Sequence, residues 1–259
     1  MYWSIPEAPK KKRVVVPPKD DLGSILKAFT TPHDATIPLP PTPIEIVSVF
    51  CPNANSQRHL TSFVVPEKVA LFVERVSAFI KLLGAKVHHT TFYAFGPDLA
   101  DYPDAIGVLH SNTLRKGEIQ GGLEENWKAF SGVVERLQKE IPEQKIELRS
   151  AMDFLGVHLA SAAQGVDAAL VERLAGIFRE QAPSYVAMDA EEVRVRVRAN
   201  LILYRATVMA VAKKNAIILG VEVSRRYWDQ LWPQLKEEKL APPLFWLPGS
   251  VRQHFGFRT

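Results

Sequence analysis

The fold is decided by IEIVSVF, residues 44–50, together with PEKVALFVERVSAFIKLLGAKVHHTTFYAF, residues 66–95. The shorter segment is a β-branched run of strand length. The longer one begins with apolar residues at helical spacing, with Pro66 suited to the first helical position and Gly84 to a C-terminal stop. A second strand is then predicted over residues 86–95. The core therefore opens with a strand, a helix and a strand, the unit that builds parallel sheets.

The rest of the chain continues this alternation of strand and helix. We read QKIELRSAMDFL, residues 144–155, as the third strand, with its paired part at 145–150. Further helices are predicted over 121–140, 166–181 and 189–215, and a further strand over 216–223. These elements predict one α/β domain over residues 44–259. Its fold class is a Rossmann-like sandwich, with a mostly parallel sheet and helices on both faces.

Residues 1–43 differ from the rest of the chain in composition, since they hold nine of its nineteen prolines. Proline removes backbone donors and fixes φ, so we expect an extended or irregular arm outside the sheet. The run PKKKR at residues 9–13 is typical of a nuclear import signal or a nucleic-acid-binding arm, and equally of a solvated basic tail. The net charge of +4 permits a polyanionic partner without requiring one.

The cellular address is predicted from cysteine usage and hydropathy. One cysteine cannot form an internal disulfide, and the first residues lack a charged start followed by an apolar run. We therefore expect a cytoplasmic protein, with a nuclear address as the alternative that PKKKR raises. The most apolar helical stretch, ANLILYRATVMAVA, is too short for a bilayer and contains Arg205, so no membrane span is predicted.

A polar turn follows the first strand and holds the only cysteine of the chain. In open α/β sheets, ligands bind beyond the carboxyl ends of the strands. Asn53 and Asn55 supply amide groups for a carbonyl or an amine, and Cys51 or Ser56 could attack an acyl centre if a neighbour took up the proton. The alternative is that Cys51 simply packs at the end of a strand.

Other common kinds of site are not predicted. The glycines of QGGLEE have no strand before them and no lysine after them, which argues against a phosphate-binding loop. His88 and His89 are adjacent on a strand and should point to opposite faces, so they cannot share a metal. We therefore expect neither a metal nor a cofactor.

In order of elements over about residues 44–250, the chain resembles the cyclodipeptide synthases, whose fold is similar to the catalytic domain of class I aminoacyl-tRNA synthetases. That family ends its first strand in a Gly-x-Ser turn followed by Asn-Ser, and VFCPNANS has Cys51 at the serine position. The stretch also resembles the synthetase phrase DPTADSLHIGHL, with His59 matching one signature histidine. Gln57 and Arg58 depart from it. No KMSKS-like loop occurs, so amino-acid activation by ATP is not implied.

The resemblance also implies a Tyr-x-x-x-Glu motif on a late helix, for which two registers compete. YVAMDAE offers Tyr185 with Asp189 four residues later, which is closer in letters. LYRATV offers Tyr204 on the helix directly before a strand, which is closer in topology, but Val208 stands at the acidic position. Both registers stay open.

A fungal subgroup, the arginine-containing cyclodipeptide synthases, diverges strongly from the bacterial pattern, and this chain resembles that kind of outlier. A pocket for arginine requires a carboxylate that meets the guanidinium group. Glu222 interrupts the apolar run AIILGVEVS and is the candidate. The alternative is a solvated glutamate on an edge strand.

The resemblance implies two aminoacyl-tRNA substrates and a diketopiperazine product. The first aminoacyl group would pass to the nucleophile, and the amine of the second would then attack it. Binding of the tRNA requires basic residues that neutralise phosphates. The candidates are Arg194, Arg198, Arg205, Lys213 and Lys214, of which the arginines follow helical spacing; the alternative is a solvated or ion-paired helix face.

Two functions of other classes stay open. A non-catalytic RNA-binding module would use the basic arm and the arginine helix, and Cys51 and Ser56 would be dispensable. A hydrolase or nucleotidyl transferase on the same fold would instead require a nucleotide or a metal.

Overall fold

The computed structural model describes residues 41–50, 66–102, 116–181, 188–212, 214–220, 225–240 and 244–246. The strands are β1 (Ile44–Phe50), β2 (Val87–Ala94), β3 (Lys145–Ser150), β4 (Ala216–Gly220) and β5 (Leu244–Trp246). The helices are α3 (Pro66–Leu83), α5 (Lys116–Glu140), α6 (Ala151–Gln164), α7 (Ala168–Gln181), α9 (Ala190–Val211) and α10 (Arg225–Glu237), with 3-10 turns at Gly84–Lys86 and Pro97–Asp101.

The strands form one sheet in the order β3-β2-β1-β4-β5, and all neighbouring pairs are parallel. The predicted Rossmann-like α/β fold class is confirmed. Ile46 pairs with Ile217, and Val47 with Ile218, so the first and fourth strands are neighbours as expected of one sheet. The strand predicted over 216–223 is described to Gly220. β5 and α10 were not predicted.

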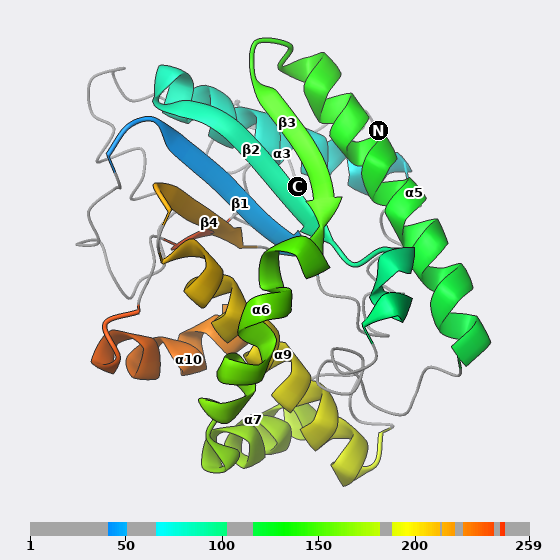
Figure 1. The fold of residues 1–259 in the computed structure, drawn as a ribbon, viewed down its shortest axis with the longest axis vertical. Coiled ribbons are helices and arrows are strands. Elements are labelled where there is room, and N and C mark those ends of the chain that lie inside the picture. Colours follow the sequence, from blue (N-terminus) through cyan, green and yellow to red (C-terminus); the bar gives the residue numbers. More distant parts are fainter. Residues whose placement is uncertain are drawn as a thin grey trace, which may run out of the picture.

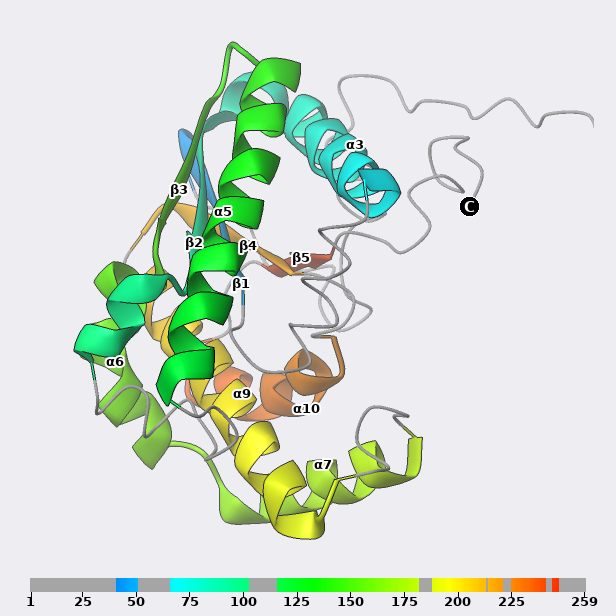
Figure 2. The ribbon, with the colours of Figure 1, turned by 90° about the vertical axis from the view of Figure 1, so that its right-hand side faces the viewer.

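Helices α3 and α5 cover one face of the sheet (Figure 2). Successive side chains of β1 and β2 point to opposite faces of the sheet. The apolar side chains on this face pack against the apolar stripes of α3 and α5. Phe79 of α3, Leu137 of α5 and Phe92 of β2 are all fully buried in this layer. The spacing of apolar residues in α3 therefore identifies the side of this helix that meets the sheet.

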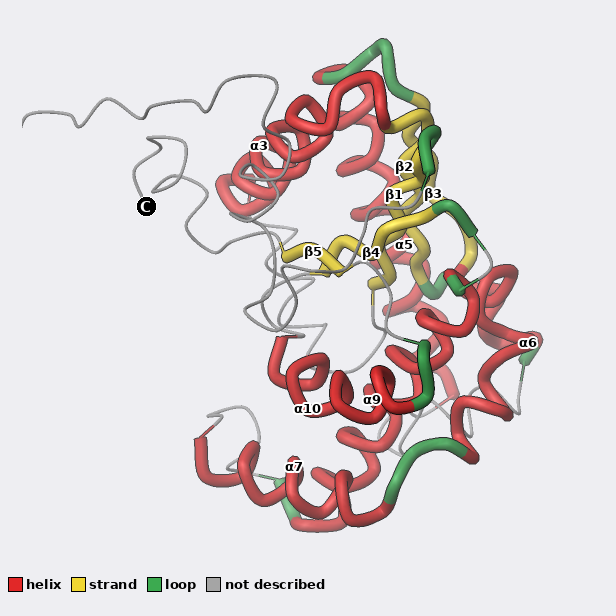
Figure 3. Tube along the Cα trace, turned by 90° about the vertical axis from the view of Figure 1, so that its left-hand side faces the viewer, coloured by secondary structure: helices red, strands yellow, loops and turns green. Residues whose placement is uncertain are grey.

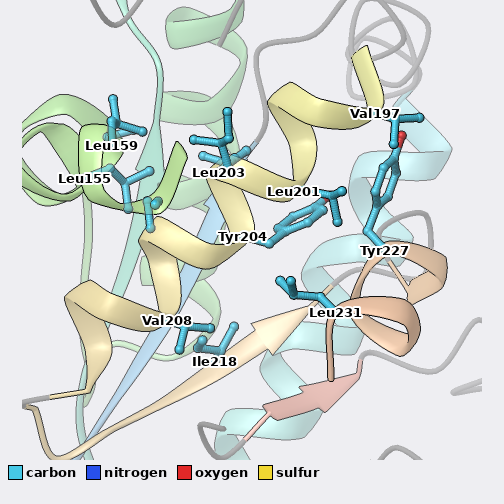
Figure 4. Close-up of a cluster of buried hydrophobic side chains, with 14 of the residues drawn as sticks. Leu155, Leu159, Val197, Leu201, Leu203, Tyr204, Val208, Ile218, Tyr227 and Leu231 are labelled. Carbon is cyan, nitrogen blue, oxygen red and sulfur yellow. The ribbon is translucent and has the colours of Figure 1, made fainter. Parts of the chain in front are cut away.

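The second helical layer consists of α6, α7, α9 and α10, which gather beyond the carboxyl ends of the strands (Figures 1 and 3). α6 contacts β2 and β3, and α9 contacts β4. Val208 of α9 lies against Ile218 of β4, and Leu203 lies near Leu155 and Leu159 of α6 (Figure 4). Residues 199–208 of α9 are buried without interruption, so this helix is the centre of the layer.

The reading of residues 151–155 as part of a strand is wrong, because α6 begins at Ala151. The Ser150 side chain accepts a hydrogen bond from the Met152 N–H at 3.1 Å and caps the helix. Met152, Leu155 and Leu159 are buried at helical spacing. A mostly apolar segment this short fits a strand or a helix by pattern, and the cap by Ser150 favours the helix.

The exposed edge strand β3 is partly covered by an amide side chain of α5. Gln138 Oε1 accepts a hydrogen bond from the Ile146 N–H at 3.0 Å, and Gln138 Nε2 donates to the Gln144 carbonyl at 2.7 Å. These bonds satisfy backbone groups that an edge strand would otherwise present to another chain.

Within the described ranges, no single helix is long and apolar enough to cross a membrane. α6 and α7 reach the required length and hydropathy only as a pair, and the two helices are bent by 101° relative to each other.

Candidate functional site

The order of the strands places a switch point between β1 and β4. From β1 the chain proceeds outward through β2 to β3, and it then returns to the other side of β1 at β4. Connections diverge at such a point, which is where open α/β sheets bind ligands. The candidate site is therefore the carboxyl edge of β1 and β4.

Many of the predicted site residues lie outside the described residues. They are Cys51, Asn53, Asn55, Ser56 and His59 after β1, Tyr185 between α7 and α9, Lys213 after α9, and Glu222 after β4. Their roles stay predictions. The described residues that surround the edge come from the ends of β2 and β3 and from α9 and α10.

The ends of β2 and β3 are tied together at this edge. The Ser150 hydroxyl donates a short hydrogen bond to Asp98 Oδ2, and the same oxygen caps α6. Gly96 turns the chain out of β2, and a Cβ there would lie 2.8 Å from the Trp127 ring. Asp98 and Ser150 are thus held in place by each other and by close packing.

The amino-terminal half of α9 extends beyond the carboxyl ends of the strands (Figure 1) and carries polar side chains that are buried. Asn200 Nδ2 donates to the Arg196 carbonyl at 2.9 Å and to the Tyr227 hydroxyl of α10 at 3.3 Å. Tyr204 lies beside Tyr227, with ring centroids 5.6 Å apart (Figure 4). Phe178 of α7 stacks on the Tyr227 ring, with ring centroids 4.8 Å apart.

These buried polar residues were missed by sequence reasoning, apart from Tyr204. A signal was present, because Arg196, Asn200 and Tyr204 follow each other at four-residue spacing and share one helix face. Arg196 is 8% exposed, and its Nη2 lies 2.6 Å from Glu192 Oε1. Arg196, Asn200, Tyr204 and Tyr227 are 2–8% exposed, and the two tyrosines pack among the core residues of the second helical layer.

The two candidate registers of the Tyr-x-x-x-Glu motif differ in the surroundings of the residue four positions after the tyrosine. Asp189 is exposed and caps α9, because its Oδ1 accepts the Glu192 N–H at 2.8 Å. Val208, the residue four positions after Tyr204, packs in the core against Ile218 (Figure 4). In the Tyr204 register no acid is available at that position, and in the Tyr185 register the acid already serves a structural role.

The predicted basic residues do not form one track along α9. Arg205 is 8% exposed and forms a two-pronged ion pair with Glu238, so its inclusion in a solvent-facing track is wrong. The helical spacing is as predicted, but the middle of α9 is covered on all sides. Arg194 is paired with Glu172 and Glu191 near the start of the helix, and Arg198 is exposed. Lys214 lies at the opposite end, beside Glu45.

The described part of the chain contains no group of three or more His, Cys, Asp or Glu side chains that could hold a metal ion. No protein-family model matches the sequence, and neither a curated protein nor a solved structure gives a significant match.

Proposed function

We propose that this protein is a tRNA-dependent cyclodipeptide synthase, which joins two aminoacyl groups from aminoacyl-tRNAs into a diketopiperazine, with arginine as one substrate. The observation that carries the proposal is the parallel pairing of β1 with β4 at the switch point of the sheet. The two segments that follow these strands contain the proposed nucleophile and the proposed arginine-binding acid.

The positions of these residues in the sequence support their proximity. Cys51 is the first residue after β1, and Glu222 is the second after β4. Val47 pairs with Ile218, and Cys51 and Glu222 each follow their strand residue by four positions in the sequence. We propose on this ground that the two side chains lie close together. Neighbouring parallel strands are about 4.8 Å apart, so a substrate arginine could reach Glu222 while its carbonyl carbon is near Cys51.

The proposed reaction requires no outside activation, because both amino acids arrive as esters. The Cys51 thiolate attacks the first ester carbonyl, forming a thioester and releasing the first tRNA hydroxyl. The amine of the second aminoacyl-tRNA attacks the thioester, which forms a dipeptidyl-tRNA and returns the thiol. The free amine of the dipeptide then attacks its own ester, closes the ring and releases the second tRNA.

The described residues of α9 and α10 suit the binding of these polar groups. The hydroxyls of Tyr204 and Tyr227 and the amide of Asn200 can donate to a carbonyl or accept from an amine. Asn200 Nδ2 donates a hydrogen bond of 3.3 Å to the Tyr227 hydroxyl and so restricts the orientation of that side chain. We propose that Tyr204, Tyr227 and Asn200 position the attacking amine, and that Arg194 and Arg198 contribute to tRNA binding at the exposed start of α9.

The test is incubation of the purified chain with a fully charged tRNA pool, followed by mass analysis of small products. We expect an arginine-containing diketopiperazine from the wild type, its loss in Cys51→Ala, and its retention in Ser56→Ala. Glu222→Gln should lose the arginine product while remaining folded. Absence of any diketopiperazine from the wild type would refute the proposal, and tRNA binding without product would instead favour the RNA-binding module.

A further inference from the structure

A second group of polar residues lies on the open face of the sheet, away from the buried residues of α9. We call it the sheet-face cluster; it comprises Glu45, His89, Thr91, Lys145, Glu147, Arg149 and Lys214. In Figure 1 this face of β1, β2 and β3 is toward the reader; α6 begins at the carboxyl ends of the strands, no described helix lies in front of their amino-terminal part, and α3 lies behind. Strand order and register bring these residues together, since Glu45, His89 and Lys145 are level on adjacent strands.

The inner members of the cluster form a continuous set of contacts across three strands. The Thr91 hydroxyl donates to Glu45 Oε1 at 2.9 Å. His89 Nε2 lies 3.4 Å from the Thr91 hydroxyl oxygen and 3.2 Å from Glu147 Oε2. Tyr93 and Phe154, whose rings stack 4.1 Å apart, border this set on the side of the carboxyl edge.

The outer members are all cations. Lys145 and Arg149 both contact Glu147, and Lys214 Nζ lies 3.7 Å from Glu45 Oε2. The cationic side chains are 38% to 60% exposed, whereas the two carboxylates are 17% and 26% exposed. A partner that approaches this face therefore meets the positive groups first.

The charge balance of the cluster is positive at neutral pH. Hydrogen bonds from Lys145 and Arg149 lower the pKa of Glu147 to about 2, so this carboxylate is ionised. Burial lowers the pKa of His89, so the imidazole is uncharged. The cluster then contains three cations and two carboxylates. Because the cations are more exposed than the carboxylates, the surface is more positive than this difference alone indicates.

We propose that the sheet-face cluster binds the phosphate backbone of RNA, namely the body of the tRNA substrate. This inference rests on the proposed function. Arg149 is level with Tyr93 and adjacent to Ser150, so the cationic face continues to the carboxyl edge where the aminoacyl end would react. The Cα atoms of Lys145 and Arg149 are about 13 Å apart along the strand, but their cationic groups converge on the two oxygens of Glu147, so they would meet a phosphate as one site.

The composition of the face favours RNA over a protein partner. Protein interfaces are typically built around apolar or aromatic anchors. The exposed large apolar residues of the described chain are Tyr102 and Val157, and neither belongs to the cluster. Phosphate binding requires only cations and hydrogen-bond donors, which this face presents.

The experiment measures the affinity of the full chain for uncharged tRNA over a series of salt concentrations. The double variant Lys145→Gln/Arg149→Gln should bind about tenfold more weakly at ~0.1 M salt, and its salt slope should fall by about 1.4–1.8. Glu147→Gln removes an inner carboxylate and releases both cations, so it should bind more tightly than the wild type. The matched control is Lys128→Gln/Lys139→Gln, which removes two exposed cations from α5.

Opposite effects of the two sheet-face variants distinguish RNA binding from a structural role, since a structural role predicts the same direction for both. Equal affinities and slopes for the wild type and the double variant would overturn the inference, as would weaker binding by Glu147→Gln or an equal loss in the α5 control. Diketopiperazine formation is assayed in parallel. Binding that obeys these predictions without product refutes the proposed function alone, and product with unchanged binding refutes this inference alone.

Discussion

Gly165 lies in the turn between α6 and α7, and a side chain there would collide with a buried ion pair. A Cβ at this position would lie 2.2 Å from Arg205 Nε and 2.4 Å from its Cζ. The φ of Gly165 is −86°, which any residue adopts, so the predicted effect of Gly165→Ala comes from this contact and not from backbone strain. Gln234 Nε2 donates to the Gly165 carbonyl at 2.8 Å and holds the turn against α10.

The magnitude follows from the groups that must move. Arg205 Nη1 donates to Glu238 Oε1 at 2.9 Å, and Nη2 contacts Oε2, so a displaced guanidinium loses both bonds while it remains buried. Breaking a buried pair costs about 3–5 kcal/mol. Glu238 is 32% exposed and regains water, so we expect a loss of about 2–3 kcal/mol for Gly165→Ala.

The assay is urea unfolding followed by circular dichroism, with thermal melts as a second measurement. The midpoint should fall with an unchanged m-value, and Tm should drop by about 4–12 °C. The matched control is Gly176→Ala in α7, where an added Cβ meets no atom within 4 Å and should stabilise the helix by about 0.5–1 kcal/mol.

The reasoning also predicts coupling between the two positions. In an Arg205→Met background, Gly165→Ala should cost less than ~1 kcal/mol, because a thioether can move aside without losing an ion pair. A change of less than ~0.5 kcal/mol in the wild-type background, or an equal loss in both backgrounds, would refute the argument.

Three further changes test other contacts. Ser150→Ala removes the cap of α6 and should lower the free energy of unfolding by about 1 kcal/mol, measured in urea; no loss would contradict the capping role. Glu147 has its pKa lowered to about 2, with the hydrogen bond from Lys145 as the largest cause. Its stabilisation is therefore present above pH 4.5 and lost as the pH falls toward 2, so the stability difference between wild type and Glu147→Gln should shrink over that range; a constant difference would oppose this. Gln138→Leu leaves the Ile146 N–H on the edge strand without its acceptor and should promote self-association, measured by light scattering against Gln164→Leu as a control; equal scattering would refute the edge role.

The elements that the sequence predicted well are those whose pattern is local. The β-branched run at 44–50 and the helical stripe after Pro66 carry their own periodicity, and the structure forms both where that periodicity starts and stops. The candidate turn that begins at Cys51 was likewise predicted from its place after a strand, and it stays a prediction. The prediction for residues 151–155 failed because four apolar residues around Asp153 are too short a pattern to separate the two periods.

Burial along α9 shows where local pattern becomes insufficient. The spacing of Arg194, Arg198 and Arg205 correctly places them on one stripe, but exposure depends on which other elements cover that stripe. α6, α7 and α10 contact α9, whose residues 199–208 are buried without interruption, so Arg205 is buried beside Glu238 while Arg198 is exposed. The same enclosure buries Asn200 beside Tyr227, a contact between residues of different helices.

The sequence by itself determined the alternation of strands and helices, the parallel sheet and the residues that face its core, because hydrophobic periodicity is a property of each segment alone. The sequence also requires that Lys145, Glu147 and Arg149 share one face of their strand, since successive side chains point to opposite faces. That Glu45, His89 and Lys214 join them was decided only by the order β3-β2-β1-β4, which pairs segments far apart in the chain. Strand order depends on the free energy of packing the whole domain, and no single segment encodes it.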